Sequence, residues 1–317
     1  MSGKIKAYDY LLKITKVKLK GIYDMNITDI TPRKSLALSL LAVTAVFWSL
    51  GGLLVKLVDW NPIAIAGARS LIAALLILFF IKKPSFKFSF LKFASAFVYA
   101  AQVILFVYAT KLTTAANAIT LQYTAPIYVA VFGALFLKEK VRWYDIITIA
   151  AVFGGMLLFF IDKLSPGGLL GNILAIISGI AFAFLALLLR LQKDDSPLDR
   201  IFWGNIMTAV VALPFMFQSM PDTRSLLGIS LLGIFQLGLS YILFSIAIKN
   251  VTALEAVLIP FIEPVLNPIW VALVVHEFPG IYSMIGGGFV LLVVAARCIY
   301  TYCLSVKQGA ASEESGG

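Results

Sequence analysis

The chain has 317 residues, of which 61% are hydrophobic and only 13% are charged. A soluble domain is about 45–50% apolar and about 25% charged, so this much apolar surface requires an apolar solvent. The composition therefore excludes a soluble enzyme, and the long apolar stretches leave no room for an ATPase domain in the same chain. The 26 basic residues exceed the 16 acidic ones, but they gather at the ends of apolar segments, which indicates membrane orientation rather than nucleic-acid binding.

Ten apolar segments are long enough to cross a bilayer, because a spanning helix needs roughly 20 mainly apolar residues. Proline, glycine or charged residues mark the breaks between them. We expect helices over residues 35–57, 62–81, 91–111, 114–137, 143–161, 169–190, 198–219, 226–248, 252–275 and 280–303. The sequence predicts an all-α integral membrane protein with ten transmembrane helices.

Basic residues alternate between the loops on the two sides. With the N-terminus inside, most Lys and Arg fall in cytoplasmic segments, and only Lys56, Lys111, Lys163 and Arg224 fall in outside loops. Positive residues favour the cytoplasmic side of a membrane. We expect both termini in the cytoplasm and the protein in the cell inner (cytoplasmic) membrane.

Residues 1–34 form a basic N-terminal segment. Ile5, Tyr8 and Leu12 recur at a three-to-four-residue spacing with lysines between them, which is typical of a helix lying on an anionic membrane surface. A poorly ordered tail is the alternative. Residues 304–317 are mostly small and polar, and we expect a disordered C-terminal tail.

Two parts of the chain are similar at an offset of 138 positions. Residues 105–139 align without gaps with residues 243–277, and the matches include Lys111/Lys249, Thr114/Thr252, Pro126/Pro264 and Glu139/Glu277. The alignment divides the chain into two five-helix repeats, 35–161 and 169–303. Because five is odd, the second repeat enters the membrane from the opposite side. Inverted repeats are a recurrent architecture of secondary transporters.

Three stretches resemble the EamA-type members of the drug/metabolite transporter superfamily. They are Asn61-Pro62 followed by Arg69, Leu121–Pro126 followed by Lys138-Glu139-Lys140, and Glu263–Trp270 followed by His276-Glu277. The likeness runs from about residue 35 to 303, and its one departure is His276, where the family pattern has glycine. The resemblance implies a ten-helix, two-repeat transporter of small organic solutes, frequently an exporter.

Glu263 is the sharpest candidate for a functional residue. It lies about 16 Å into the 252–275 segment, near the middle of a hydrocarbon core about 30 Å thick. An ionisable side chain at that depth is costly and marks a functional site. We expect Glu263 to line the substrate cavity. It is also the candidate carrier of a coupling proton, because a low dielectric favours a neutral carboxyl, with facilitative transport without a coupling proton as the alternative. A structural contact with Arg69 or with freed backbone groups is the alternative.

Four prolines are expected to break the helices near the midplane: Pro126, Pro260, Pro264 and Pro268. A proline leaves the carbonyl four residues earlier without its donor, so the carbonyls of Ala256, Pro260 and Pro264 need other partners. Irregular helix at that depth is tolerated only against protein or a water-filled cavity. These prolines therefore favour a cavity near Glu263.

Other polar residues recur in the middle of the predicted spans. Arg69 cannot readily lose its charge and needs a carboxylate, carbonyls, water or an anionic solute beside it. Ordinary hydrogen bonding between helices would explain each residue alone, whereas the set favours a cavity with apolar walls and a few polar anchors. The expected lining is Arg69, Tyr99, Gln102, Asn117, Gln122, Tyr123, Gln236, Ser240, Glu255, Glu263 and Asn267.

The sequence lacks the common motifs of nucleotide-driven pumps, metalloenzymes and metal sites. A phosphate-binding GxxxxGK[ST] loop, an HExxH motif and paired cysteines do not occur, so we expect no catalytic residue, metal or cofactor. A carrier of small organic metabolites such as amino acids is favoured, with a channel or an intramembrane enzyme as alternatives. Gly51-Gly52, Gly154-Gly155 and Gly286-Gly287-Gly288 would permit close helix packing within the chain or in a homodimer.

Overall fold

The computed structural model describes residues 33–81, 83–87, 89–137, 142–161, 168–192 and 196–276, with short pieces between 281 and 300. In the first repeat the helices are α2 (Lys34–Leu57), α3 (Pro62–Ile81), α4 (Phe90–Leu112), α5 (Ala115–Gln122), α6 (Ala125–Phe136) and α7 (Trp143–Ile161). In the second they are α8 (Leu169–Leu191), α9 (Pro197–Met216), α10 (Thr223–Leu231), the π-helix η3 (Leu232–Leu239), α11 (Ser240–Ala247), α12 (Ala253–Leu258), the 3-10 helix η4 (Ile259–Ile262) and α13 (Glu263–Val275).

These helices follow the predicted spans between residues 35 and 275 to within a few residues, although the fourth, eighth and ninth spans are composite. Six helical stretches in the described part are long and apolar enough to cross a membrane, and Trp143–Gly155 is a shorter apolar helix. The tenth predicted span, the segment 1–32 and the tail 304–317 lie wholly or largely outside the described residues. Glu139 and Glu277 lie outside them too.

The two repeats are built alike. α12 and α13 begin at Ala253 and Glu263, each 138 positions after the first residues of α5 and α6. The hydroxyl oxygens of Thr114 and Thr252 cap α5 and α12 by accepting backbone N–H bonds three residues on, both at 3.1 Å. α3 and α9 each begin at a proline and have 20 residues. The internal similarity seen in the sequence thus extends to where helices begin and break.

The repeats run in opposite directions. The side chain of Thr113, after the end of α4, contacts Asn172 at the start of α8, with Oγ1 and Oδ1 2.9 Å apart. Arg190, at the end of α8, donates to the Lys249 carbonyl just after α11, at 2.9 Å. The related helices α4 and α11 therefore end at opposite ends of α8. This is the arrangement that inverted repeats require.

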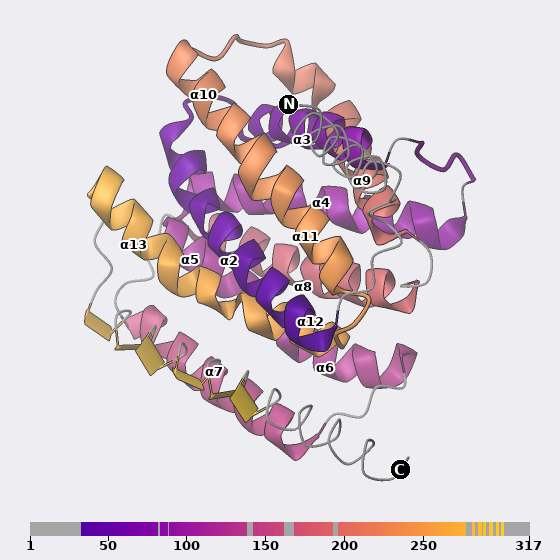
Figure 1. Ribbon diagram of the computed structural model, residues 1–317. Coiled ribbons are helices and arrows are strands. Elements are labelled where there is room, and N and C mark those ends of the chain that lie inside the picture. Colours follow the sequence, from indigo (N-terminus) through magenta and orange to yellow (C-terminus); the bar gives the residue numbers. More distant parts are fainter. Residues whose placement is uncertain are drawn as a thin grey trace, which may run out of the picture.

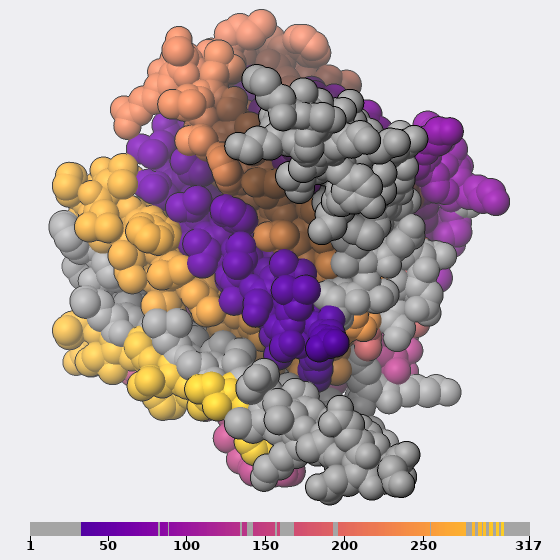
Figure 2. Space-filling view, in the orientation of Figure 1, coloured from indigo at the N-terminus to yellow at the C-terminus, as the bar shows by residue number. Residues whose placement is uncertain are grey.

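Contacts between the repeats come in related pairs. α4 packs on α8 as α11 packs on α2, and α6 packs on α8 as α13 packs on α2, while the related helices α3 and α9 pack on each other. In Figure 1, α2 crosses the face of the bundle between α13 and α11, and α7 lies at its edge. Figure 2 shows the same order at the surface, with α2 in indigo between the yellow-orange α13 and the orange α10–α11.

The exposed and buried side chains are distributed as a membrane protein requires. Large apolar side chains such as Phe79, Phe97 and Leu273 are exposed on outer faces, where lipid would cover them. The core contains a cluster of aromatic rings around Trp48 and Tyr241.

Glycine permits close contacts at several places in this core, and two of them lie against polar groups. A Cβ on Gly179 of α8 would lie 2.4 Å from the carbonyl oxygen of Gln122, at the α5–α6 break, and one on Gly52 of α2 would lie 2.4 Å from Oδ1 of Asn267. Gly154 was expected to serve helix packing, but a Cβ on it would have nothing within 4 Å among the described residues. Gly52 and Gly179 therefore permit close approach, and Gly154 has no such contact among the described residues.

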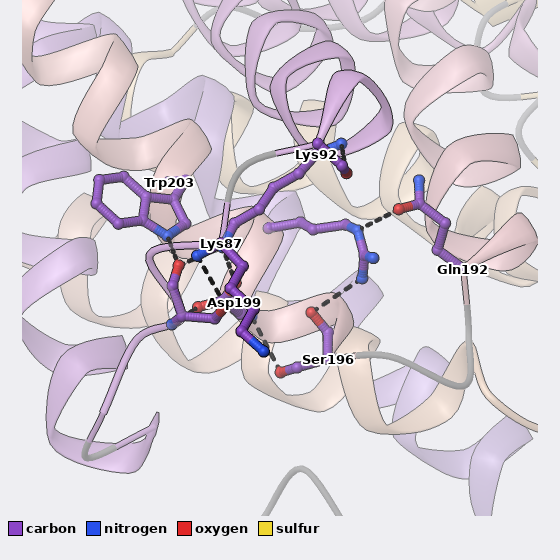
Figure 3. A network of polar contacts seen from close by, with 9 residues as sticks. Lys87, Lys92, Gln192, Ser196, Asp199 and Trp203 are labelled. Carbon is purple, nitrogen blue, oxygen red and sulfur yellow. Dashed lines mark hydrogen bonds and ion pairs between the residues drawn. The ribbon is translucent and has the colours of Figure 1, made fainter.

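A polar network holds the loop before α4 against α9 (Figure 3). The ammonium of Lys92 lies 2.6 Å from Oδ2 of Asp199, and both side chains are buried. Oδ1 of Asp199 accepts a hydrogen bond from the Ser85 N–H at 2.8 Å, and the indole of Trp203 donates to the Ser85 carbonyl at 3.0 Å. The network ties the first repeat to the second at one end of the bundle.

Candidate functional site

A small cavity lies where the two repeats meet. It has room for roughly one or two water molecules, and the residues that line it are buried. Its walls come from both repeats and combine aromatic rings with polar groups. The lining residues are Trp48, Arg69, Gln102, Val103, Phe106, Gln122, Tyr123, Phe182, Gln236, Leu237, Tyr241 and Glu263.

Arg69 reaches the cavity from α3. Its side chain is 1% exposed, and Nη1 donates to Oε1 of Gln236 at 2.9 Å. Nη2 donates to the Val103 carbonyl at 3.3 Å, whereas Nε has no partner. Gln236 stands on the π-helix η3, a form of helix that is frequent at functional sites. The guanidinium is therefore held between the two repeats by neutral oxygens.

Glu263 enters the cavity at the start of α13. The Tyr123 hydroxyl lies 2.6 Å from Oε2 of Glu263 and 2.8 Å from the carbonyl oxygen of Pro260. That carbonyl is one of those that a proline four residues later was expected to free, and it also accepts the backbone N–H of Glu263 in a 3-10 turn. Tyr123 of the first repeat thus contacts both the Pro260 carbonyl at the helix break of the second repeat and the Glu263 carboxyl group.

A second set of hydrogen bonds crosses the cavity wall. Tyr241 donates to Oε1 of Gln102 at 3.1 Å, and the amide of Gln122 donates to the Ser178 hydroxyl oxygen at 2.8 Å. The Ser178 hydroxyl donates in turn to the backbone carbonyl of Gln102 at 3.0 Å. Trp48 lies between the rings of Tyr241 and Phe182, with centroids 5.2 and 5.7 Å away. The polar groups are oriented by these bonds on a rigid aromatic wall.

Six residues of the expected lining border the cavity: Arg69, Gln102, Gln122, Tyr123, Gln236 and Glu263. The other five lie outside the wall. Tyr99 is directly behind it, with its ring 5.0 Å from that of Tyr241 and its hydroxyl donating to Asn205. The hydroxyl of Ser240 donates to the Gln236 carbonyl, back along its own helix.

Glu255, Asn117 and Asn267 do not reach the cavity either. Glu255 completes a capping box with Thr252 and lies 2.9 Å from the Lys34 ammonium, so it serves the start of α12. Asn117 occupies the same third position of α5. Asn267 is fully buried against Gly52. Glu255 therefore serves a helix start, whereas Asn117 and Asn267 have buried amide atoms without a hydrogen-bond partner among the described residues.

The prolines divide in a similar way. Pro126 lies in the first turn of α6, directly after the break at Tyr123-Thr124, and Pro260 and Pro264 lie in and just after η4. Pro268 was also expected to break its helix, but α13 continues through it from Glu263 to Val275. A helix can continue past proline where neighbouring groups satisfy the freed carbonyl.

Sequence reasoning missed the aromatic part of the lining, above all Trp48, Phe182 and Tyr241. The 138-residue offset held one usable signal, because it relates Val103 to Tyr241, and both border the cavity. Nothing in the sequence distinguishes Trp48 or Phe182 from aromatic residues that face lipid. Their helices had to be packed before their faces could be assigned.

Two oppositely directed helical repeats around a buried polar cavity define the architecture of inverted-repeat membrane transport proteins. The chain matches the EamA-like transporter family over residues 35–161 and again over residues 169–296, and it belongs to that family. It is a multi-pass membrane protein of a family of transporters, as the sequence motifs indicated.

The fold is shared with a protein of known crystal structure. The two superpose with a TM-score of 0.70 at 15% sequence identity, over 86% of this chain and 99% of the other. At that identity the likeness concerns the fold alone. No curated protein matches this chain.

Proposed function

We propose that this protein is a secondary carrier that exports small organic metabolites, such as amino acids, by alternating access. It lies in the cytoplasmic membrane with both termini inside, and residues 280–303 form the tenth helix. In this proposal the cavity between the repeats is the solute site, and rearrangement of one repeat against the other opens it to each side in turn.

One observation carries the proposal. Arg69 of the first repeat and Glu263 of the second are both buried, and both border the same cavity. Ionisable groups inside a membrane protein are costly and are retained for solute or ion pathways. A site shared by two inverted repeats can be exposed to either side by the same movement, which suits a carrier better than a permanently open channel.

Glu263 is the proposed carrier of a coupling proton. The Tyr123 hydroxyl has one proton but faces two acceptors, the Pro260 carbonyl and the Glu263 carboxyl. Both short contacts are full hydrogen bonds if the tyrosine donates to the carbonyl and a protonated carboxyl donates to the tyrosine oxygen. The geometry therefore supports a proton on Glu263 in the described conformation.

Flux measurements in proteoliposomes test the function. We expect saturable uptake that is accelerated by unlabelled solute on the opposite side, measured over a panel of radiolabelled amino acids and nucleobases. A pH gradient should drive accumulation by the wild type but not by Glu263→Gln, while exchange at equal pH persists in the variant. Ion conductance without accelerated exchange would indicate a channel, and Glu263→Gln with unchanged pH-driven accumulation would refute the coupling role.

A further inference from the structure

The charge of Arg69 is not balanced by an acidic side chain. Its two hydrogen bonds go to neutral oxygens, one from the Gln236 amide and one from the Val103 backbone. In the part of the chain that the structure describes, Arg69 takes part in no ion pair with an acidic side chain. A buried charge is costly unless an opposite charge accompanies it. An anion is the missing partner of this group.

The guanidinium also has donors to spare. It presents five N–H groups in a rigid fork that matches the two oxygens of a carboxylate. Two of the three nitrogens have hydrogen bonds, and Nε is buried without a partner. A buried donor without an acceptor is unfavourable, so a carboxylate bound here would satisfy hydrogen-bonding capacity as well as charge.

The rest of the cavity limits what the anion can be attached to. Trp48, Phe106 and Phe182 supply apolar and aromatic surface, which suits an uncharged organic body. Arg69 is the single cationic side chain among the described lining residues, so a second carboxylate on the solute would have no cation to pair with. A solute with one carboxylate fits this lining better than a dicarboxylate or a cation without an acidic group.

We propose that Arg69 is the anion-binding residue of the cavity and that the transported solute is a small monocarboxylate, amino acids included. The inference rests on the proposed carrier function and names the solute class of the same site. When the solute is bound, its carboxylate accepts hydrogen bonds from the guanidinium, including the unpaired Nε, and its apolar part lies against the aromatic wall.

Thermal-shift and exchange measurements on the purified full-length chain test this assignment. The probes are leucine, phenylalanine and phenylacetate. Each is compared with the amide in which a neutral carboxamide replaces the carboxylate: leucinamide, phenylalaninamide and phenylacetamide. We expect at least one free acid to stabilise the wild type and exchange across liposomes with an affinity about tenfold or more above that of its amide. Arg69→Gln should remove that preference, and Arg224→Gln, which changes an exposed arginine far along the chain, should keep it.

A second variant keeps the test decisive if Arg69→Gln does not fold. Gln236→Glu places a carboxylate of the same size against Nη1 of Arg69, where the amide oxygen now lies 2.9 Å away. The internal anion should raise the unfolding temperature of the solute-free protein and abolish its response to free acids. A merely structural Arg69 would leave that response unchanged, because the hydrogen bond itself is retained.

Three results would overturn the assignment: no free acid affects the wild type, the amides act as well as the acids, or either variant keeps the wild-type preference. Failure of the carrier function would look different, because no solute of any charge would then show accelerated exchange. Exchange of neutral or cationic solutes without a preference for acids would leave the carrier proposal standing and refute only the anion site.

Discussion

The hydroxyl of Tyr123 lies 2.6 Å from Oε2 of Glu263, and each residue stands at the broken part of the fourth span of its own repeat. Tyr123 follows α5 directly, and Glu263 is the first residue of α13 after η4. The two helix breaks therefore meet at the cavity and are joined there by a short polar contact. Breaking two related helices at one depth places irregular backbone and polar side chains in the same small volume.

A double-mutant cycle should detect this contact. Tyr123→Phe removes the donor to the Pro260 carbonyl and leaves the Glu263 carboxyl without its partner, so we expect a loss of about 1–2 kcal/mol in the free energy of unfolding. Glu263→Met removes the same contact from the other side. The two changes should couple by about 1 kcal/mol in denaturant titrations in micelles, and strict additivity would show that the contact contributes nothing.

The Lys92–Asp199 pair should matter for stability and not for solute preference. Lys92→Met leaves the buried Asp199 carboxylate without its cation, and we expect a loss of about 3 kcal/mol. The double variant Lys92→Met, Asp199→Asn should recover much of that loss, since no uncompensated charge then remains. Unfolding midpoints of the single and double variants measure this, and equal midpoints would contradict it.

Gly179 should not tolerate a side chain. A Cβ there would lie 2.4 Å from the Gln122 carbonyl oxygen, so α8 would have to move away from the α5–α6 break. We expect Gly179→Ala to cost about 1–3 kcal/mol and to reduce transport, because Gln122 lines the cavity. Gly154→Ala is the matched control, because no described residue lies within 4 Å of its Cβ, and it should be neutral or stabilising by up to about 1 kcal/mol.

His276 ends α13 in the left-handed region, with φ 59° and ψ 25°, and is the one non-glycine residue with positive φ in the described part. Glycine adopts this conformation without strain, which accounts for the glycine that the resemblance led us to expect at this position. A β-branched residue is strained there, so His276→Val should cost about 1–2 kcal/mol. His276→Gly should be close to neutral, since glycine removes the strain while losing the histidine contacts. Thermal unfolding of both variants would test the difference, and equal losses would contradict the backbone explanation.

Glu255 should act on stability alone. It caps α12 through the Thr252 N–H at 2.9 Å and pairs with the half-exposed Lys34. Glu255→Ala should therefore cost about 1 kcal/mol, mainly from the cap, because a partly exposed ion pair contributes little. Exchange rates per folded molecule should stay at the wild-type level. If Glu255→Ala lost exchange while keeping normal stability, Glu255 would have a role in solute transport.

Much of the fold could be predicted from the sequence, because a spanning segment must be apolar and must satisfy its backbone hydrogen bonds within itself. Helix positions therefore follow from local composition, and the 138-residue offset with an odd number of spans per repeat is enough to predict inversion. The residues at the two helix breaks could also be found, since a proline near the middle of a span interrupts the backbone hydrogen bonds there. Tyr123 and Glu263 were both identified beside such prolines.

The members of the cavity wall depended on the tertiary structure. Glu255 and Gln236 are both polar residues in apolar segments, but only the packing of the helices shows that one caps a helix and the other holds Arg69. The two repeats have similar helices but differ in their charged residues. Arg69 is the eighth residue of α3, whereas the eighth residue of the related helix α9 is Gly204. Sequence determines which segments enter the membrane, because burial in lipid is a property of a stretch of chain. Tertiary structure decides which side chains share a cavity, because that depends on how each helix is rotated against its neighbours.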